Sequence, residues 1–195
     1  MASYDDRTAL IVVDVQNDFA APTGSLHVPG AEAAIPAINR EIGRAAAAGA
    51  VIVYTQDWHP AHTPHFQRDG GVWPVHCVGG SEGAAFHPAL DVREGPVIRK
   101  GTEGEDGYSA FSVRNPDSGE QFATALEAEL RERGIERIVI VGLATDYCVK
   151  ETGLDAARLR FPATVVMDAI RAVDLEPGDG ERALDALREA GIALE

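Results

Sequence analysis

The sequence predicts an α/β fold: a single-domain, three-layer sandwich in which helices cover both faces of a central, mostly parallel six-stranded sheet. Three observations predict it. Several short segments are continuously apolar, as buried parallel strands are, instead of alternating in polarity. Segments with helical patterns lie between them, and such alternation with short connections is typical of a parallel sheet. The length of 195 residues suits one domain.

The predicted strands, in chain order, are residues 8–13, 50–55, 96–99, 137–142, 163–167 and 192–194, of which the third and the last are short. The predicted helices are 31–48, a segment from the capping-box pattern Ser118-x-x-Gln121 to about Gly134, 145–159 and 180–190. Residues 57–95 and 101–117 lack a periodic pattern. Because a loop as long as 57–95 is usually functional or disordered, and this one holds two tryptophans and a cysteine, we expect it to be functional.

The charge balance narrows the choice of partners. Seventeen lysines and arginines against 31 aspartates and glutamates give a net charge of -14, which disfavours nucleic acid and anionic membranes. Two cysteines cannot form a disulfide framework, and free thiols suit a reducing cytosol. No segment approaches the roughly 18 apolar residues of a membrane span. We therefore expect a cytoplasmic protein that acts on a small molecule. The sequence does not decide whether the protein forms a homo-oligomer.

Charged or nucleophilic residues follow four of the predicted strands. They are Asp14, Asp57, Lys100 and, a few residues beyond the fourth strand, Cys148. Because the carboxyl ends of parallel strands meet at one edge of a sheet, we expect these side chains to converge there. With Thr145 as an N-cap, Cys148 would lie in the first turn of a helix, where the helix dipole favours a thiolate.

Each of these residues also has a simpler interpretation. A free cysteine such as Cys148 is mostly a packing residue. Taken singly, Lys100 suits a solvated surface, and Asp14 suits a turn or a helix cap. Only the combination of acid, amine and thiol indicates nucleophilic catalysis.

Five of the six histidines lie within the loop 57–95. Asp57 and His59 are two residues apart, so an extended backbone puts both side chains on one face. Imidazoles with a carboxylate suit a divalent transition ion that keeps open positions for water or substrate. The alternative is a solvated loop in which histidines accumulate. We assign His87 a structural role and leave His62 undecided between ligand and bystander.

Aromatic side chains also gather near the predicted strand ends. Phe19, Trp58, Trp73, Tyr108 and Phe111 all fall in segments predicted to be irregular. Such residues can form walls for a flat ring, or they can be parts of a lid.

Six motifs together resemble the nicotinamidases of the isochorismatase-like cysteine hydrolase superfamily. They are DVQNDF at 14–19, DWHP at 57–60, WPVHC at 73–77, RKG at 99–101, YSAF at 108–111 and GLATDYCV at 142–149. The DWHP and WPVHC pair separates nicotinamidases from relatives without a metal. The resemblance runs from about residue 8 to the last predicted strand. It implies one isochorismatase-like hydrolase domain over 1–195, with a metal-binding loop region at about 57–95.

The resemblance implies a metal-dependent amidase that hydrolyses nicotinamide to nicotinate and ammonia through a cysteine thioester, with pyrazinamide as a further candidate substrate. Its implied catalytic triad is Asp14, Lys100 and Cys148, and the N–H groups of Ala144 and Cys148 form its oxyanion hole beside a cis Leu143–Ala144 bond. The implied substrate contacts are Phe19, Trp73 and Tyr108. The implied ligands of one divalent ion are Asp57, His59 and His76, and His65 matches a fourth histidine that some members use. Zinc is the favoured ion, although iron and manganese suit the same ligands.

Three other functions fit the residues less well. A superfamily hydrolase acting on isochorismate, a carbamoyl amine or a ureido compound would not need the metal residues that this chain has. A non-catalytic metal-binding module would not need Asp14, Lys100 and Cys148. A dinucleotide oxidoreductase would carry G-x-G-x-x-G after the first strand, where this chain has none. The acidic segment 101–107, GTEGEDG, departs modestly from the family pattern.

Overall fold

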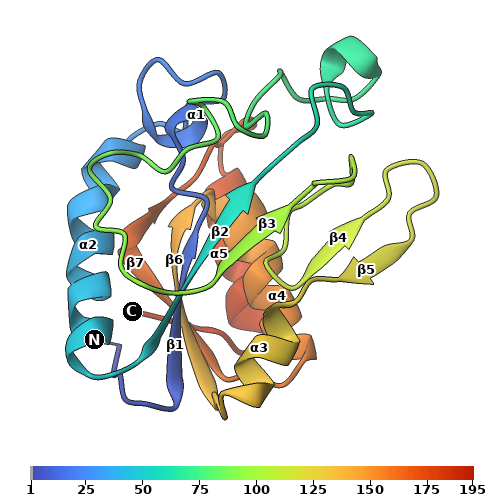
Figure 1. The fold of residues 1–195 in the computed structure, drawn as a ribbon. Helices are drawn as coiled ribbons and strands as arrows, with labels where there is room; N and C mark the ends of the chain where they lie inside the picture. The colour runs from blue at the N-terminus through green and yellow to red at the C-terminus, as the bar shows by residue number, and fades with distance from the viewer. Residues whose placement is uncertain (1) are drawn as a thin grey trace.

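A computed structural model describes residues 2–195, in which six parallel strands form one sheet flanked by helices (Figure 1). The strands of this sheet, in the spatial order β3-β2-β1-β6-β7-β8, are β1 (Thr8–Val13), β2 (Val51–Asp57), β3 (Val97–Lys100), β6 (Arg137–Leu143), β7 (Ala163–Arg171) and β8 (Ala193–Leu194). The helices are α1 (Asn17–Ala20), α2 (Ala31–Ala47), α3 (Leu126–Glu132), α4 (Lys150–Arg158) and α5 (Asp179–Glu189), with a 3-10 turn η1 (Gln67–Asp69) and a π-helical turn η2 (Thr145–Val149). The predicted fold class and all six predicted strands are confirmed.

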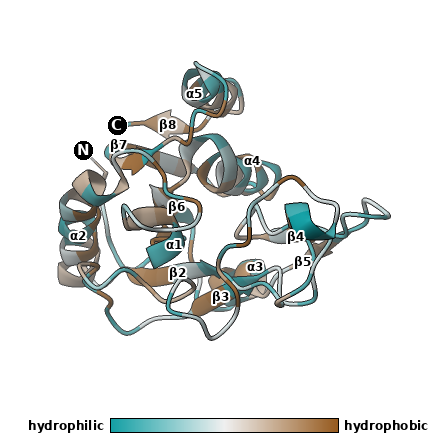
Figure 2. Cartoon of the chain, turned by 90° about the horizontal axis from the view of Figure 1, so that it is seen from above, coloured by the Kyte–Doolittle hydropathy of each residue, from teal (hydrophilic) through white to brown (hydrophobic). Residues whose placement is uncertain are grey.

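Two apolar cores, one on each face of the sheet, make the three layers. Along β1, Leu10 and Val12 pack on the side of α2, whereas Ala9 and Ile11 pack on the side of α3, α4 and α5. This division follows from the pleat of a strand, which points successive side chains to opposite faces. Figure 2 shows α2 on one side of the strands and α4 on the other. Both faces of the central strands are therefore buried, as their continuously apolar sequences predict.

The chain changes direction across the sheet beside β1. It runs outward from β1 to β2 and β3, and it then returns to β6 on the other side of β1. β1 and β6 stay in register up to the pair Val13 and Gly142. A crevice opens outside the carboxyl ends of the strands at such a switch point, and ligands of α/β sheets bind there.

The predicted helix start at Ser118 is wrong. Residues Gln121–Ala123 instead form β5, which pairs with β4 (Ser112–Arg114) in a small antiparallel hairpin. The hydroxyl of Ser118 accepts the N–H of Glu120 within the hairpin turn, so it caps no helix. The helix α3 begins only at Leu126. The capping-box pattern is local, and pairing with β4 outweighs it.

The role of Thr145 as an N-cap is also wrong. Residues Thr145–Val149 form the π-helical turn η2, preceded by Ala144, and no side chain caps it. The carbonyl of Ala144 accepts the N–H of Val149 at 3.0 Å, five residues on, which is the π-helical pattern. Cys148 therefore lies in a π-helical turn ahead of α4. Within residues 2–195 no helix has both the length and the apolar character needed to cross a bilayer.

Candidate active site and metal centre

Four ionisable side chains meet at the carboxyl end of the sheet. The ammonium of Lys100 lies 2.7 Å from Asp14 Oδ2 and 2.9 Å from Asp57 Oδ1, and its side chain has no exposed surface. Carboxylate oxygens of Asp14 and Asp57 and the sulfur of Cys148 all lie within 4.8 Å of one another. The structure thus brings together the acid, the amine and the thiol that lie far apart in the sequence.

Asp14 is held in an uncommon backbone conformation, with φ at +49°. The hydroxyl of Thr55 donates to Asp14 Oδ1 at 2.5 Å and accepts the N–H of Asp14 at 3.1 Å. Left-handed backbone at a residue other than glycine persists where its surroundings hold it, and it is concentrated at active sites. Sequence analysis missed Thr55. The sequence feature that could have identified Thr55 is its position two residues before Asp57, which puts both side chains on the same face of one strand.

Burial and Lys100 set the charges of this cluster. Burial raises the pKa of the Cys148 thiol well above its usual range, against the opposing charge of Lys100. Burial likewise raises the pKa of Asp14. Burial alone would lower the pKa of Lys100, but the charges of Asp14 and Asp57 outweigh it and raise that pKa. The resting cluster therefore combines a protonated Cys148 thiol with a charged Lys100.

Three buried histidines form a second group beside the first. Ring nitrogens of His59, His65 and His76 lie within 4.8 Å of one another. Asp57 Oδ2 lies 3.8 Å from the Nε2 atoms of both His59 and His76. Burial would raise the pKa of Asp57, but Lys100 and His59 hold it well below its usual range, so the carboxylate is charged. One oxygen of Asp57 thus faces Lys100, and the other faces two histidines.

The donor set fits a divalent transition ion. Both ring nitrogens of His59 are buried without a hydrogen-bond partner, which native proteins rarely allow and which a bound ion would explain. His76 Nδ1 bonds to the carbonyl of Pro74 at 2.7 Å, and His65 Nδ1 lies 2.8 Å from Asp106 Oδ1. In each case Nε2 stays available as a ligand atom. Burial lowers the pKa of His76 to about 4, so its imidazole is neutral, as a ligand has to be.

The remaining histidines of the loop lie elsewhere. The side chain of His62 is 77% exposed and pairs with Asp69, so His62 lies outside the buried group. His87 accepts the N–H of Ala89 through Nδ1 in a local turn, in keeping with its structural assignment.

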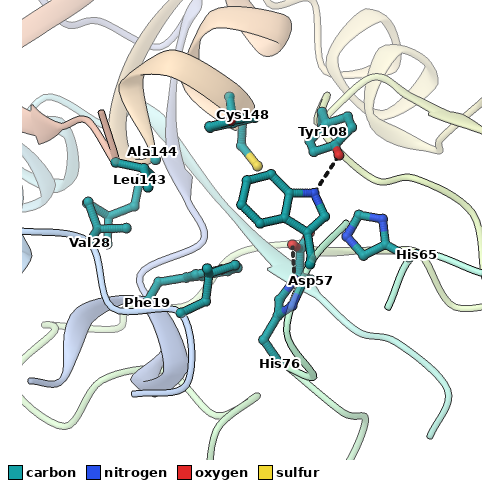
Figure 3. Close-up of a pocket in the computed structure, with 13 residues that line it drawn as sticks. Phe19, Val28, Asp57, His65, His76, Tyr108, Leu143, Ala144 and Cys148 are labelled. Atoms are coloured by element: carbon teal, nitrogen blue, oxygen red, sulfur yellow. Dashed lines mark hydrogen bonds and ion pairs between the residues drawn. The ribbon is translucent and has the colours of Figure 1, made fainter. Parts of the chain in front are cut away.

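A cavity joins Cys148 to the histidines (Figure 3). Figure 3 shows Cys148 and Ala144 along one side of it and His65 and His76 along the other. Its lining residues are Phe19, Leu26, Val28, Asp57, His65, Trp73, His76, Tyr108, Leu143, Ala144, Tyr147, Cys148 and Val173. The Leu143–Ala144 peptide bond, which the resemblance implies to be cis, is cis.

The aromatic residues divide into two sets. Phe19, Trp73 and Tyr108 line the cavity, and the indole N–H of Trp73 donates to the hydroxyl of Tyr108 at 2.8 Å. Phe19 lies in α1, so its expected place in an irregular segment is wrong. Trp58 and Phe111 do not line the cavity. Trp58 stacks under the guanidinium of Arg99, and Phe111 packs on Phe161 in the core.

Sequence analysis also missed Tyr147, which lines the cavity, and Asp146, which supports the cavity wall from behind. Tyr147 meets Trp73 edge to face with ring centroids 4.9 Å apart, and its signal was its place directly before Cys148. Asp146 accepts the N–H groups of Val173 and Asp174 at 2.9 and 2.8 Å, which fixes the segment after β7 against the cavity. No local pattern points to that contact, because it joins residues 27 positions apart.

Comparison with known proteins defines the class. The chain belongs to the isochorismatase domain family, which it matches over residues 8–194. It is 38% identical to a nicotinamidase of Escherichia coli (strain K12), over 95% of this chain and 93% of that protein. These findings confirm the expected resemblance to nicotinamidases and the expected class of enzyme, a hydrolase of carbon–nitrogen bonds.

Two solved structures are similar over nearly the whole chain. A pyrazinamidase of Pyrococcus horikoshii in complex with zinc has a TM-score of 0.86 and 39% identity, covering 97% of this chain and 98% of that one. PnC1 from L. infantum in complex with nicotinate has a TM-score of 0.88 and 36% identity, covering 100% of this chain and 95% of that one.

Proposed function

We propose that this chain hydrolyses nicotinamide to nicotinate and ammonia through a thioester on Cys148. One observation carries the proposal. The ammonium of Lys100 contacts Asp14, beside the thiol, and Asp57, beside the histidines, so the two groups share one cavity. Nicotinamide has a carboxamide at one end and a ring nitrogen at the other. A single molecule lying between Phe19 and Trp73 could present one end to each group.

Acylation follows from the cluster of acid, amine and thiol. The sulfur of Cys148 attacks the carboxamide carbon while Asp14 takes the thiol proton, which lets a thiol of raised pKa react without first ionising. Lys100 stabilises the negative charge that Asp14 and Cys148 share. The N–H groups of Ala144 and Cys148 receive the developing oxyanion, an effect worth about 3–4 kcal/mol per donor.

Loss of ammonia completes acylation, and hydrolysis of the thioester then restores the enzyme. Asp14 first returns its proton to the departing ammonia as the carbon–nitrogen bond breaks and the thioester remains. Water then attacks the thioester carbon while Asp14 takes a proton from it, and the thiol leaves with that proton. Nicotinate dissociates, and the net reaction consumes one amide and one water. The raised pKa of Asp14 suits a group that alternates between base and acid.

A divalent ion held by Asp57, His59 and His76, with His65 as a fourth ligand, is part of the proposal. We favour zinc, with iron or manganese as alternatives. When bound, the ion supplies a Lewis acid for the ring nitrogen of the substrate. Phe19, Trp73 and Tyr108 would hold the flat ring, and pyrazinamide, which also has ring nitrogens, would be accepted.

We also propose a cytosolic location for the protein, because its two free cysteines suit a reducing compartment.

Ammonia release from nicotinamide by the metal-loaded protein tests the function. Benzamide, which has the same carboxamide but no ring nitrogen, should react far more slowly.

Changing Cys148→Ala should lower turnover by at least about 10³-fold, because the nucleophile is lost, and should leave metal content intact. Changing Cys77→Ala, at the other buried cysteine, is the control and should preserve turnover. Substantial amidase activity in the Cys148→Ala protein would end the nucleophile assignment.

A further inference from the structure

The acidic segment 101–107 is attached to both groups of the site. The carbonyl of Gly107 accepts a hydrogen bond from the ammonium of Lys100. The carbonyl of Gly104 accepts one from the hydroxyl of Thr63 at 2.8 Å. The carboxylate of Asp106 lies 2.8 Å from Nδ1 of His65. Only this last contact joins a carboxylate of the segment to one of the three clustered histidines.

The backbone and both carboxylate oxygens of Asp106 have bonding partners. Its backbone pairs with that of Arg114 through two hydrogen bonds of 2.8 and 2.9 Å. Its Oδ2 lies 2.9 Å from the guanidinium of Arg114, while its Oδ1 faces His65. The Asp106 side chain is 11% exposed and that of His65 4%. The contact between Asp106 and His65 is therefore largely shielded from solvent, and the second carboxylate oxygen is engaged by Arg114.

The three clustered histidines differ in what holds their rings. His76 bonds to a backbone carbonyl, and His59 has no hydrogen-bond partner for either nitrogen. His65 alone bonds to a carboxylate. A carboxylate acceptor keeps the proton on Nδ1, turns the Nε2 lone pair toward the ligand side of the ring and makes Nε2 a stronger donor to a metal.

We propose that Asp106 is a positioning residue that makes His65 a fourth protein ligand of the metal centre. Asp106 touches neither substrate nor ion; it acts through the tautomer and orientation of His65. The inference rests on the metal centre of the proposed function and extends it to the segment 101–107.

The test measures metal binding, which needs no substrate. Zinc affinity is determined by competition with a chromophoric chelator, and the absorption spectrum of the cobalt-substituted protein reports ligand geometry. Changing Asp106→Ala should weaken zinc binding about 10- to 100-fold and alter the cobalt spectrum. Changing Asp106→Asn, which keeps an acceptor oxygen, should recover part of the loss. Changing Asp69→Asn is the matched control, because Asp69 pairs at 3.2 Å with the exposed His62, and it should change neither readout.

A double-mutant cycle separates positioning from general support of the loop. Changing His65→Ala should itself weaken zinc binding, and adding Asp106→Ala to that variant should cause little further loss, because both changes remove one interaction. Unchanged zinc affinity in His65→Ala, or in a folded Asp106→Ala protein, would overturn the inference. An Asp106→Ala loss of the same size in the His65→Ala background would overturn it as well.

The outcomes also separate this inference from the proposed function. A protein that binds zinc in an Asp106-dependent manner but releases no ammonia from nicotinamide would overturn the function and leave the positioning role intact. A protein that hydrolyses nicotinamide but whose zinc affinity does not change in the Asp106→Ala variant would overturn the positioning role and leave the proposed function intact.

Discussion

At the scale of single residues, Lys100 connects the two groups of the site. It is one fully buried ammonium between two buried carboxylates, and such a cluster is stable only while its charges stay paired. Changing Lys100→Met should lower the free energy of unfolding by about 3–5 kcal/mol at pH 7, because Asp14 and Asp57 lose their counter-charge.

The pH dependence of that loss is a sharper test. In the metal-free protein without Lys100, burial raises the folded-state pKa values of the two carboxyls above their unfolded values, so the variant loses stability as pH rises through them. The deficit relative to the unmodified protein should therefore shrink between pH 7 and pH 5, as urea denaturation would show. Changing Lys150→Met, at a partly exposed surface pair with Glu151, should cost less than about 0.5 kcal/mol. A deficit that is constant with pH would contradict this account.

His76 supports a second prediction at the same scale. Burial lowers its pKa from 6.5 to about 4, so between these values the unfolded chain binds a proton that the metal-free native state does not. The stability of the metal-free protein should therefore fall as pH drops from about 6.5 to 4, by about 3 kcal/mol from this group. Denaturation of chelator-treated protein at several pH values measures the slope. Changing His76→Gln should flatten it, and an equal slope in that variant would show that another group is responsible.

At the scale of elements, the close pairing of β1 with β6 positions Asp14 and Cys148. Gly142 has φ at +114°, and a Cβ atom there would lie 2.1 Å from the carbonyl oxygen of Val13. Changing Gly142→Ala should force the two strand ends apart and cost about 2–4 kcal/mol. Changing Gly43→Ala is the matched control, since no atom lies within 4 Å of its added Cβ and it lies inside α2. That variant should gain about 0.5–1 kcal/mol.

Thermal unfolding of the two variants compares them directly, and turnover of the Gly142→Ala protein tests whether the strand contact also sets the catalytic geometry. Equal effects of the two substitutions on stability would contradict the packing account of Gly142.

At the scale of the whole molecule, a bound ion should stabilise the fold, because the histidine group exists only once the loop 57–95 has packed on the sheet. An ion that binds the native state alone, at 100 times its dissociation constant, adds about 2.7 kcal/mol. For a chain of this size the midpoint of thermal unfolding should rise by roughly 5–10 °C when zinc is added to metal-free protein. Calorimetry measures the shift. Changing His59→Ala should reduce it, whereas an unchanged shift in that variant would place the ion elsewhere.

The local sequence was sufficient to predict the strands, because a strand buried on both faces needs a continuous apolar run. It also predicted that Asp14, Asp57 and Lys100 follow strands and therefore share one sheet edge. It failed at Ser118, where pairing of β5 with β4 decides the conformation, and at Thr145, where the π-helical turn η2 replaces the expected helix start. It also missed Thr55, Tyr147 and Asp146, whose roles depend on contacts between segments.

The sequence by itself therefore determined the layers of the sandwich and the residue types at the strand ends, since both follow from hydrophobic burial and from the alternation of side chains along a strand. Only the tertiary structure decided that Lys100 lies between two carboxylates, that His62 lies outside the histidine group and that Asp106 contacts His65. The physical reason is that hydrogen bonds and ion pairs act over about 3 Å, and no pattern within one segment records which distant group will come that close.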